Sequence, residues 1–255
     1  MELFYREQGE GTPLIILHGL FGSSDNWLTV TKSLAQNFKI YLVDQRNHGR
    51  SPHSEEFNYT VMSKDLLEFV ENKGIQEANI IGHSMGGKVA MKFAVDNPDK
   101  VKNLIIVDIA PKYYPPHHDN ELRGLKSIDP QKMPNRQVAD EILSKTLPDL
   151  GVRQFLLKNM MREGDQFKWR MNLHSIEKNI ENIGEPLDPR KQFDKPTLFI
   201  RGGKSRYIKD EDFTLITEIF PNSKVTTIPT SGHWVQAEAP EEFLEIVNDF
   251  LEANP

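Results

Sequence analysis

The sequence predicts an α/β fold with a mostly parallel central sheet flanked by helices and with an inserted helical cap. Three observations support this prediction. Short, continuously apolar runs alternate with segments of helical periodicity, as in a parallel sheet wound by right-handed crossovers. The alternation stops between residues 112 and 189, which offer helical stretches instead. A Gly-x-Ser-x-Gly pattern at residues 82–86 lies where an apolar run gives way to a helical one.

The first part of the chain supplies one edge strand and four buried strands that alternate with helices. Residues 2–7 alternate in polarity and predict the edge strand, which a glycine turn closes. The other runs are predominantly apolar, and residues 13–17 continuously so, which is typical of strands covered on both faces. They comprise residues 13–17, 38–44, 79–83 and 101–108, with helices over 25–36, 60–73 and 85–96 between them.

The second part contains the interruption and then resumes the alternation. The interrupting segment has no convincing buried strand, and its helical stretches fall near residues 118–127, 135–147, 150–161 and 172–182. Strands over 196–201 and 224–228 follow, with helices over 211–220 and 241–251. We therefore predict a core domain, residues 1–111 and 190–255, and a helical cap, residues 112–189. Long inserted segments of this kind exclude water and shape a pocket at the strand ends.

Composition narrows the classes of function. The chain of 255 residues has a net charge of −6 with both signs interspersed, which disfavours nucleic acid and anionic membranes as partners. It has no cysteine, which excludes disulfides, thiolate metal sites and cysteine nucleophiles. No apolar run approaches the ~18 residues of a membrane span, and the first residues do not resemble a signal peptide. We expect a cytoplasmic protein, monomeric or dimeric, that acts on a small molecule without a metal or a cofactor.

Ser84 is the candidate nucleophile. It follows the apolar run that ends at His83, and the flanking Gly82 and Gly86 permit a sharp strand-to-helix turn where side chains would collide with backbone. Such a turn lifts the hydroxyl clear of the sheet edge. It also directs the N-terminus of the following helix at the charge that develops there.

A serine needs an adjacent base, which in turn needs an orienting acid. His233 is the candidate base, because it lies in a short glycine-containing loop after the last strand and follows the nucleophile in chain order. The remaining histidines flank turns or lie in polar loops and in the predicted cap, and we expect structural or solvated roles for them. They are His18, His48, His53, His83, His117, His118 and His174.

Two sets of residues compete for the role of the acid. Asp108 ends the apolar run of the fourth buried strand and faces the same crevice, and a carboxylate there needs a partner such as an imidazole N–H. Asp210 and Asp212 follow the next strand, but their positions are also those of an N-cap and first turn of a helix. The residues alone favour Asp108 and leave the alternative open.

The oxyanion hole is expected to consist of two backbone N–H groups. One belongs to Met85, directly after the nucleophile, and the other to Leu20, with Phe21 as the less favoured choice. Several apolar residues could line a substrate pocket, although they could equally pack the cap's own core. The pocket candidates are Phe21, Phe155, Met160 and Trp169.

Five stretches together make the chain resemble the α/β-hydrolases, and among them the small bacterial YbfF-type esterases. They are HGLFGS at 18–23, DQRNHGRSP at 44–52, GHSMGGK at 82–88, VDIAP at 107–111 and GHW at 232–234. The resemblance covers residues 2–253. It implies a carboxylic-ester hydrolase with a helical cap that prefers short or medium acyl chains and acyl thioesters. It also implies that the acid stands at Asp108 and that Ser205, which occupies the family's other position for the acid, lies near the triad.

The main hypothesis is therefore ester hydrolysis through an acyl-enzyme formed on Ser84. A second hypothesis is a lyase or synthase of the menaquinone-pathway kind, which would use the same triad for proton abstraction and an arginine clamp for its substrate. A third is a ligand receptor with a hydrolase shell and no turnover, against which the intact Ser84 and His233 argue. The arginines available for a clamp in the cap are Arg123, Arg136, Arg153, Arg162 and Arg170.

Overall fold

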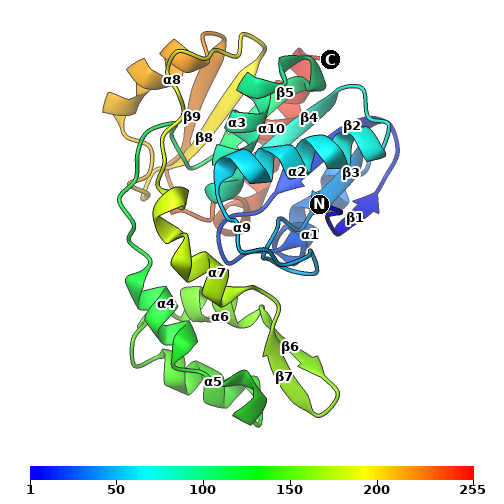
Figure 1. The fold of residues 1–255 in the computed structure, drawn as a ribbon. Coiled ribbons are helices and arrows are strands. Elements are labelled where there is room, and N and C mark those ends of the chain that lie inside the picture. Colours follow the sequence, from blue (N-terminus) through cyan, green and yellow to red (C-terminus); the bar gives the residue numbers. More distant parts are fainter.

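A seven-stranded sheet forms the centre of the computed structural model, which describes residues 1–255 (Figure 1). The strands lie in the order β1-β3-β2-β4-β5-β8-β9, and all neighbours are parallel except β1 and β3. The fold class predicted from the sequence is therefore confirmed. The strands are β1 (Tyr5–Gln8), β2 (Thr12–Leu17), β3 (Phe38–Val43), β4 (Ala78–His83), β5 (Val101–Val107), β8 (Thr197–Gly202) and β9 (Ser223–Ile228).

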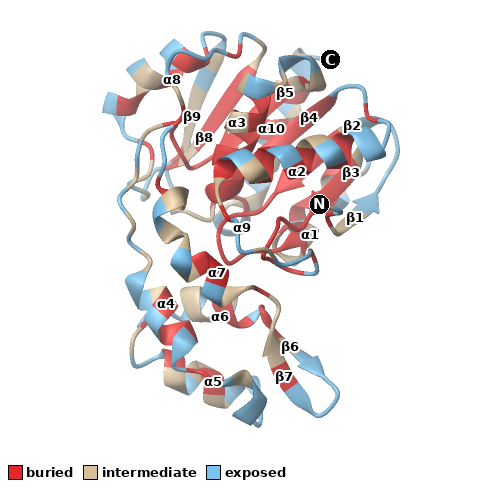
Figure 2. Cartoon of the chain, viewed as in Figure 1, coloured by how far each residue is buried: buried red, intermediate tan, exposed pale blue.

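Helices cover both faces of the sheet, and alternate strand residues point to opposite faces. In β2, Ile15 and Leu17 belong to the larger core cluster, which includes side chains of α2 (Tyr59–Asn72), α3 (Met85–Asp96) and α8 (Phe213–Ile219). The intervening Leu14 and Ile16 belong to the second cluster, with α1 (Leu28–Leu34) and α10 (Pro240–Ala253). Figure 2 shows the resulting buried strands between helices whose outer faces are exposed. Both faces are apolar because both are covered, which explains the continuous apolar runs.

The segment between β5 and β8 lies off the end of the sheet, below it in Figure 1. We refer to residues 112–189 as the cap segment. It contains the predicted helices but also an antiparallel hairpin, so the prediction of helices alone, with one of them extending to residue 161, is wrong. Its elements are α4 (Asp119–Lys126), α5 (Arg136–Leu143), α6 (Leu150–Leu157), β6 (Met160–Glu163), β7 (Gln166–Trp169) and α7 (Leu173–Lys178).

The chain crosses from core to cap twice, and the two crossings lie side by side. The N–H of Tyr114 donates to the carbonyl of Gly184 at 2.9 Å, and the N–H of Leu187 donates to that of Pro111, also at 2.9 Å. A buried lysine of α3, Lys88, donates to one carbonyl in each crossing, as described below. None of the helices combines the length and apolar character that a membrane-spanning segment requires.

Candidate active site

Ser84 stands at a strained turn between β4 and α3. Its φ of 52° and ψ of −120° lie in a region that residues with a side chain rarely adopt. Steric contacts exclude any residue other than glycine at the two flanking positions. A Cβ on Gly82 would lie 2.4 Å from the carbonyl oxygen of Gly86. A Cβ on Gly86 would lie 2.5 Å from the carbonyl oxygens of Leu17 and His18 in the neighbouring strand. The serine is thus held at the first turn of α3, at the carboxyl edge of the sheet.

The imidazole of His233 is fixed by an acid on one edge and a ring on one face. Its Nδ1 lies 2.7 Å from Oδ2 of Asp108, which directs the other ring nitrogen, Nε2, away from the acid. The ring of Tyr207 stacks on it, with centroids 4.0 Å apart and an interplanar angle of 17°. A ring held in this way has little freedom to rotate, so the direction of Nε2 is set by the fold.

The loop that carries His233 is held by its backbone as well. Nε2 of His83 lies 2.9 Å from the carbonyl oxygen of His233 and donates to it. The carboxylate of Glu238, at the end of the short helix α9 (Val235–Glu238), accepts the N–H groups of Gly232 at 2.7 Å and Trp234 at 3.2 Å. The residues on both sides of the histidine therefore share one acceptor.

Asp108 follows β5 directly and is fully buried. Its φ of 50° is a second strained backbone position, which turns the carboxylate towards β8 and the His233 loop. Oδ1 accepts the N–H of Gly202 at 3.0 Å, while Oδ2 accepts from His233 and from the hydroxyl of Ser205. Three donors around a buried carboxylate satisfy its need for hydrogen bonds.

Asp210 and Asp212, the alternative acids, lie elsewhere. Asp210 is exposed and pairs with Arg201 at 2.6 Å. Asp212 pairs with Lys112 at 2.7 Å and accepts the N–H of Lys209 at 2.8 Å, the arrangement of a residue that closes the start of a helix. Neither carboxylate contacts His233, so the structure brings only Asp108 to the imidazole.

Ser84 and His233 line one cavity of about 200 Å³, which we call the serine cavity. They do not hydrogen bond to each other directly, and catalytic hydrogen bonds of this kind commonly tighten only when substrate is bound. Apolar side chains from the core and from α6 form much of the wall. The other lining residues are Gly19, Leu20, Phe21, His83, His117, His118, Glu121, Val152, Phe155, Leu156, Tyr207 and Trp234.

Two backbone N–H groups beside Ser84 have no partner within the protein. Met85 is the first residue of α3, and the first N–H groups of a helix have no intrahelical acceptor. Leu20 follows Gly19, whose Cβ, if present, would lie 3.3 Å from Cβ of Ser84, so this peptide passes beside the serine. The N–H of Phe21 instead donates to Nε2 of His48 at 3.1 Å and is occupied. The geometry therefore favours Leu20 and Met85 over Phe21 as oxyanion donors.

The four predicted pocket residues separate into two pairs. Phe21 and Phe155 line the serine cavity. Met160 and Trp169 do not line it, because they are opposite one another in the β6–β7 hairpin and pack in the core cluster. Phe155 also contacts the ring of Trp234, with centroids 5.5 Å apart.

A second cavity of about 260 Å³, which we call the side cavity, adjoins the serine cavity. The two cavities share Gly19, His83, Phe155 and Trp234 as lining residues. Fewer apolar residues line the side cavity than the serine cavity, although the indole of Trp27 is among them. Its further lining residues are His18, Gly22, Asn26, Trp27, Gly151, Gln154, Lys158, Gln236, Ala237 and Glu238.

Burial keeps the histidines around the serine neutral. It lowers the pKa of His48 to about 3, and the neighbouring imidazole of His18 contributes to this effect. Burial likewise lowers the pKa of His118 to about 3 and that of His83 well below the usual range. Neutral imidazoles can accept as well as donate hydrogen bonds, which His48 does with Phe21. His48 and His83 therefore serve as fixed hydrogen-bond partners at neutral pH.

Lys88 of α3 is a buried amine without a carboxylate partner. Its Nζ donates to the carbonyls of Lys112 and Glu185, one in each crossing between core and cap. Burial lowers its pKa to about 7. A neutral amine has two N–H donors, and the two carbonyls satisfy both of them.

The cap arginines do not form a clamp in the serine cavity, since none of them lines it. Arg153 pairs with Asp140 at 2.9 Å, and Arg170 pairs with Asp25 at 2.7 Å. Arg136 donates to the carbonyl of Met160 at 2.6 Å. The guanidinium of Arg162 lies over the ring of Phe167, and that of Arg123 binds Asn120.

The residues that support the site were not apparent from the sequence. Tyr207 and Glu238 act on His233 through packing and backbone contacts, and no spacing rule identifies them. His48 looked like a polar loop residue, but it is fully buried. Its only signal was its place between Arg46 and Gly49 in a tight loop.

Comparison with known proteins identifies the family of the chain. A family model described as alpha/beta hydrolase fold matches residues 12–240. The chain is 34% identical over 248 residues to Esterase YbfF of Escherichia coli, with 96% of this chain and 95% of that protein covered. It is 37% identical over 246 residues to the sn-1-specific diacylglycerol lipase ABHD11 of Mus musculus, with 93% of this chain and 80% of that protein covered. The resemblance inferred from the motifs is confirmed.

Comparison with solved structures supports the same family and fold. A marine microorganism esterase superimposes with a TM-score of 0.94 and is 46% identical, with 98% of this chain and 99% of that chain covered. The E-2-(acetamidomethylene)succinate hydrolase superimposes with a TM-score of 0.82 at 20% identity, with 98% of this chain and 95% of that chain covered, and shows likeness of fold alone.

Proposed function

Since the chain belongs to the α/β-hydrolase fold family, we propose that it is a serine esterase that cleaves short- to medium-chain acyl esters and thioesters. One observation carries the proposal. A serine at a strained turn shares a cavity with an imidazole whose Nδ1 lies 2.7 Å from a fully buried carboxylate. This is the arrangement that activates a hydroxyl for attack on a carbonyl.

In the first half of the reaction, Oγ of Ser84 attacks the carbonyl carbon while Nε2 of His233 takes its proton. The carbonyl oxygen becomes an oxyanion, which the N–H groups of Leu20 and Met85 hold; each such donor is worth ~10²–10³ in rate. The bond to the alcohol or thiol then breaks, and the imidazolium returns a proton to this leaving group. Asp108 accepts the Nδ1–H throughout and stabilises the imidazolium.

In the second half, water attacks the acyl group on Ser84. His233 takes a proton from the water, the same two N–H groups hold the oxyanion, and the ester bond to Ser84 breaks. The acid departs, and the serine hydroxyl regains its proton from the imidazolium. No metal or cofactor takes part in either half of this mechanism.

We assign the acyl chain to the serine cavity and the leaving group to the side cavity. The serine cavity has a volume of about 200 Å³. That room suits a short to medium chain packed against Leu20, Val152 and Leu156. In this proposal residues 112–189 act as the cap that closes both cavities, and the substrate is a small molecule rather than a polymer.

The test is an acyl-chain series of p-nitrophenyl esters from acetate to palmitate, with an acyl thioester and a diacylglycerol added because of the relatives. Ser84→Ala provides the blank. We expect saturable turnover that is greatest for short or medium chains and stoichiometric labelling of Ser84 by a fluorophosphonate. A wild-type protein that neither hydrolyses any of these esters nor forms an adduct would refute the proposal.

The lyase or synthase alternative receives less support from the structure. A substrate with several carboxylates needs cationic partners beside the nucleophile, and no arginine lines the serine cavity. An acyl-enzyme trapped with an activated ester would count against this alternative. Steady turnover would remove the reading of the chain as a receptor.

A further inference from the structure

The backbone of Phe21 is held from two sides, by the core and by the cap segment. Its N–H donates to Nε2 of His48 at 3.1 Å, and its carbonyl oxygen accepts from Nδ2 of Asn159 at 2.6 Å. The residue itself has a φ of 59°, which is strained for a phenylalanine. A conformation of this kind persists only where its surroundings determine it. The two contacts lie one and two peptide units after the Gly19–Leu20 peptide, which presents the N–H of Leu20.

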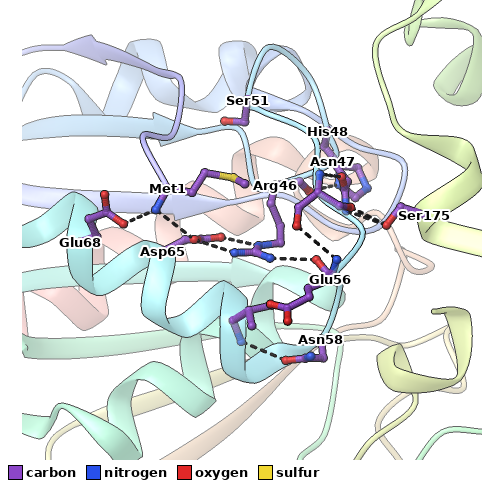
Figure 3. Close-up of polar contacts among 12 residues, drawn as sticks. Met1, Arg46, Asn47, His48, Ser51, Glu56, Asn58, Asp65, Glu68 and Ser175 are labelled. Carbon is purple, nitrogen blue, oxygen red and sulfur yellow. Dashed lines mark hydrogen bonds and ion pairs between the residues drawn. The ribbon is translucent and has the colours of Figure 1, made fainter. Parts of the chain in front are cut away.

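The contact from the core is rigid. Nδ1 of His48 lies 2.9 Å from the carbonyl oxygen of Arg46 and must donate to it, so Nε2 is the acceptor for Phe21. Arg46 is held in turn by Asp65 at 2.6 and 2.8 Å and by the carbonyl of Glu56 at 2.8 Å (Figure 3). The ring of His48 is thus held through the backbone of Arg46, whose side chain forms a buried ion pair with Asp65.

The contact from the cap segment comes from a buried amide. Asn159 lies between α6 and β6 and is only 3% exposed. Its Nδ2 faces two carbonyl oxygens, that of Phe21 and that of Leu156 at 3.2 Å. Two acceptors require a donor, which fixes the orientation of the amide. Its own carbonyl accepts the N–H of Arg170 at 2.8 Å, which ties it to the end of the hairpin.

We propose that Asn159 is a positioning residue for the oxyanion hole, through which the seated cap segment fixes the direction of the Leu20 N–H. The proposal rests on the proposed esterase function. Without the amide, the Phe21 carbonyl loses its donor inside a buried interface, and the strained turn keeps only the contact with His48 and its own hydrogen bond from Gly22 to Gly19 at 2.9 Å. The residues of this turn then have more freedom to move, which misplaces the N–H of the Gly19–Leu20 peptide that is aimed at the developing oxyanion.

The proposal gives the cap segment a second task besides closing the pocket. The core alone supplies Ser84, Asp108, His233 and the Met85 N–H, but the second oxyanion donor depends on a side chain that arrives with the cap segment. A substrate bound while Asn159 is displaced would meet one donor in place of two. Turnover would therefore require a seated cap segment, whereas ground-state binding would depend on it less.

Asn159→Ala and Asn159→Asp test this, since the aspartate keeps the shape of the side chain but cannot donate from that atom when ionised. We expect kcat for a short p-nitrophenyl ester to fall 10- to 100-fold with KM within about 3-fold, because one oxyanion donor is worth up to ~10²–10³. The affinity for a trifluoromethyl ketone, whose adduct with Ser84 carries an oxyanion, should fall in proportion to kcat/KM.

Asn182→Ala is the matched control. Nδ2 of Asn182 also donates to a core carbonyl across the same interface, that of Phe57 at 3.1 Å, but far along the chain from the oxyanion turn. We expect it to lower thermal stability as much as Asn159→Ala does and to leave kcat within about 3-fold.

The outcomes separate the possibilities. Wild-type kcat and unchanged ketone affinity in both Asn159 variants would overturn the proposal, as would an equal loss of kcat in Asn182→Ala. An increase in KM with unchanged kcat would also overturn it, because it would show that Asn159 contributes to substrate binding rather than to stabilisation of the oxyanion. A wild-type protein without esterase activity would instead refute the proposed function.

Discussion

Replacing Asp108 with asparagine should abolish most of the ester hydrolysis without unfolding the protein. The carboxylate has three donors around it, from Gly202, Ser205 and His233. The side chain of asparagine has only one acceptor oxygen for these three donors, and its second polar group is an NH₂ donor. The N–H of Gly202 is part of β8 and cannot turn away, so the amide oxygen must face it. The NH₂ group is then left opposite His233.

This arrangement forces the imidazole into the wrong tautomer. An NH₂ group facing Nδ1 requires Nδ1 to accept, so the ring proton moves to Nε2, which can no longer take the proton of Ser84. The hydroxyl of Ser205 can rotate to accept from the amide instead, so the substitution leaves no buried donor unpaired on that side. The equivalent change in a serine protease lowers kcat ~10⁴-fold, or about 5.5 kcal/mol of transition-state stabilisation. We expect a loss of that order here.

The assay is steady-state hydrolysis of p-nitrophenyl butyrate, with the loss expected in kcat and little change in KM. Asp210→Asn is the matched control, because Asp210 is the exposed alternative acid and pairs only with Arg201. Its kcat should remain within about 3-fold of wild type. If Asp108→Asn retained more than a tenth of wild-type kcat while Asp210→Asn lost most of it, the reasoning from the Asp108 contacts would be refuted.

Two further predictions concern pH and stability. Because the pKa of His48 is about 3 in the folded chain, the unfolded chain binds protons more readily between pH 6.5 and 3, so stability is lost as pH falls through this window, by up to about 5 kcal/mol. In His48→Gln this loss should be smaller between pH 6.5 and 4, as measured by urea unfolding. Because the pKa of Lys88 is about 7, the unfolded chain binds the extra proton between pH 7 and 10.5, and stability increases with pH by up to about 1.4 kcal/mol per unit. Lys88→Met should lack this increase between pH 7.5 and 9.

Each of these predictions has a control on the same element or of the same residue type. His53→Gln changes an exposed histidine and should leave the acid branch of the stability curve as in wild type. Lys92→Met changes a lysine on the same helix as Lys88, one that pairs with Asp96. Parallel stability curves for wild type and His48→Gln, or for wild type and Lys88→Met, would contradict the corresponding prediction.

Much of the fold could be predicted because burial leaves a direct trace in the sequence. Strands β2, β4 and β5 each contain a run of buried apolar residues, because helices cover both faces of the sheet. The β6–β7 hairpin could not be predicted in the same way. Its strands have four residues each, Arg162 and Lys168 lie within them, and antiparallel backbone pairing rather than a buried face defines them.

The same distinction applies to the candidate site. Ser84 could be proposed from its glycines because the turn itself excludes other residues, and His233 and Asp108 from their places after strands. Asn159 and Glu238 could not, since each acts through a contact with the backbone of a residue elsewhere in the chain, and an amide or carboxylate in a polar segment has no distinguishing pattern. The candidate catalytic residues could be predicted from the sequence, and the residues that position them could not.

The amine of Lys88 donates to a carbonyl of the segment that enters the cap segment, that of Lys112, and to a carbonyl of the segment that leaves it, that of Glu185. Neither lobe can therefore separate without breaking contacts to the helix that begins at the nucleophile. Calorimetry should show a single endotherm for the whole chain rather than one for each lobe. Proteolytic cleavage at the exposed turn between β6 and β7 should leave the two fragments associated, since Nζ of Lys88 hydrogen bonds to a carbonyl on each side of the cut.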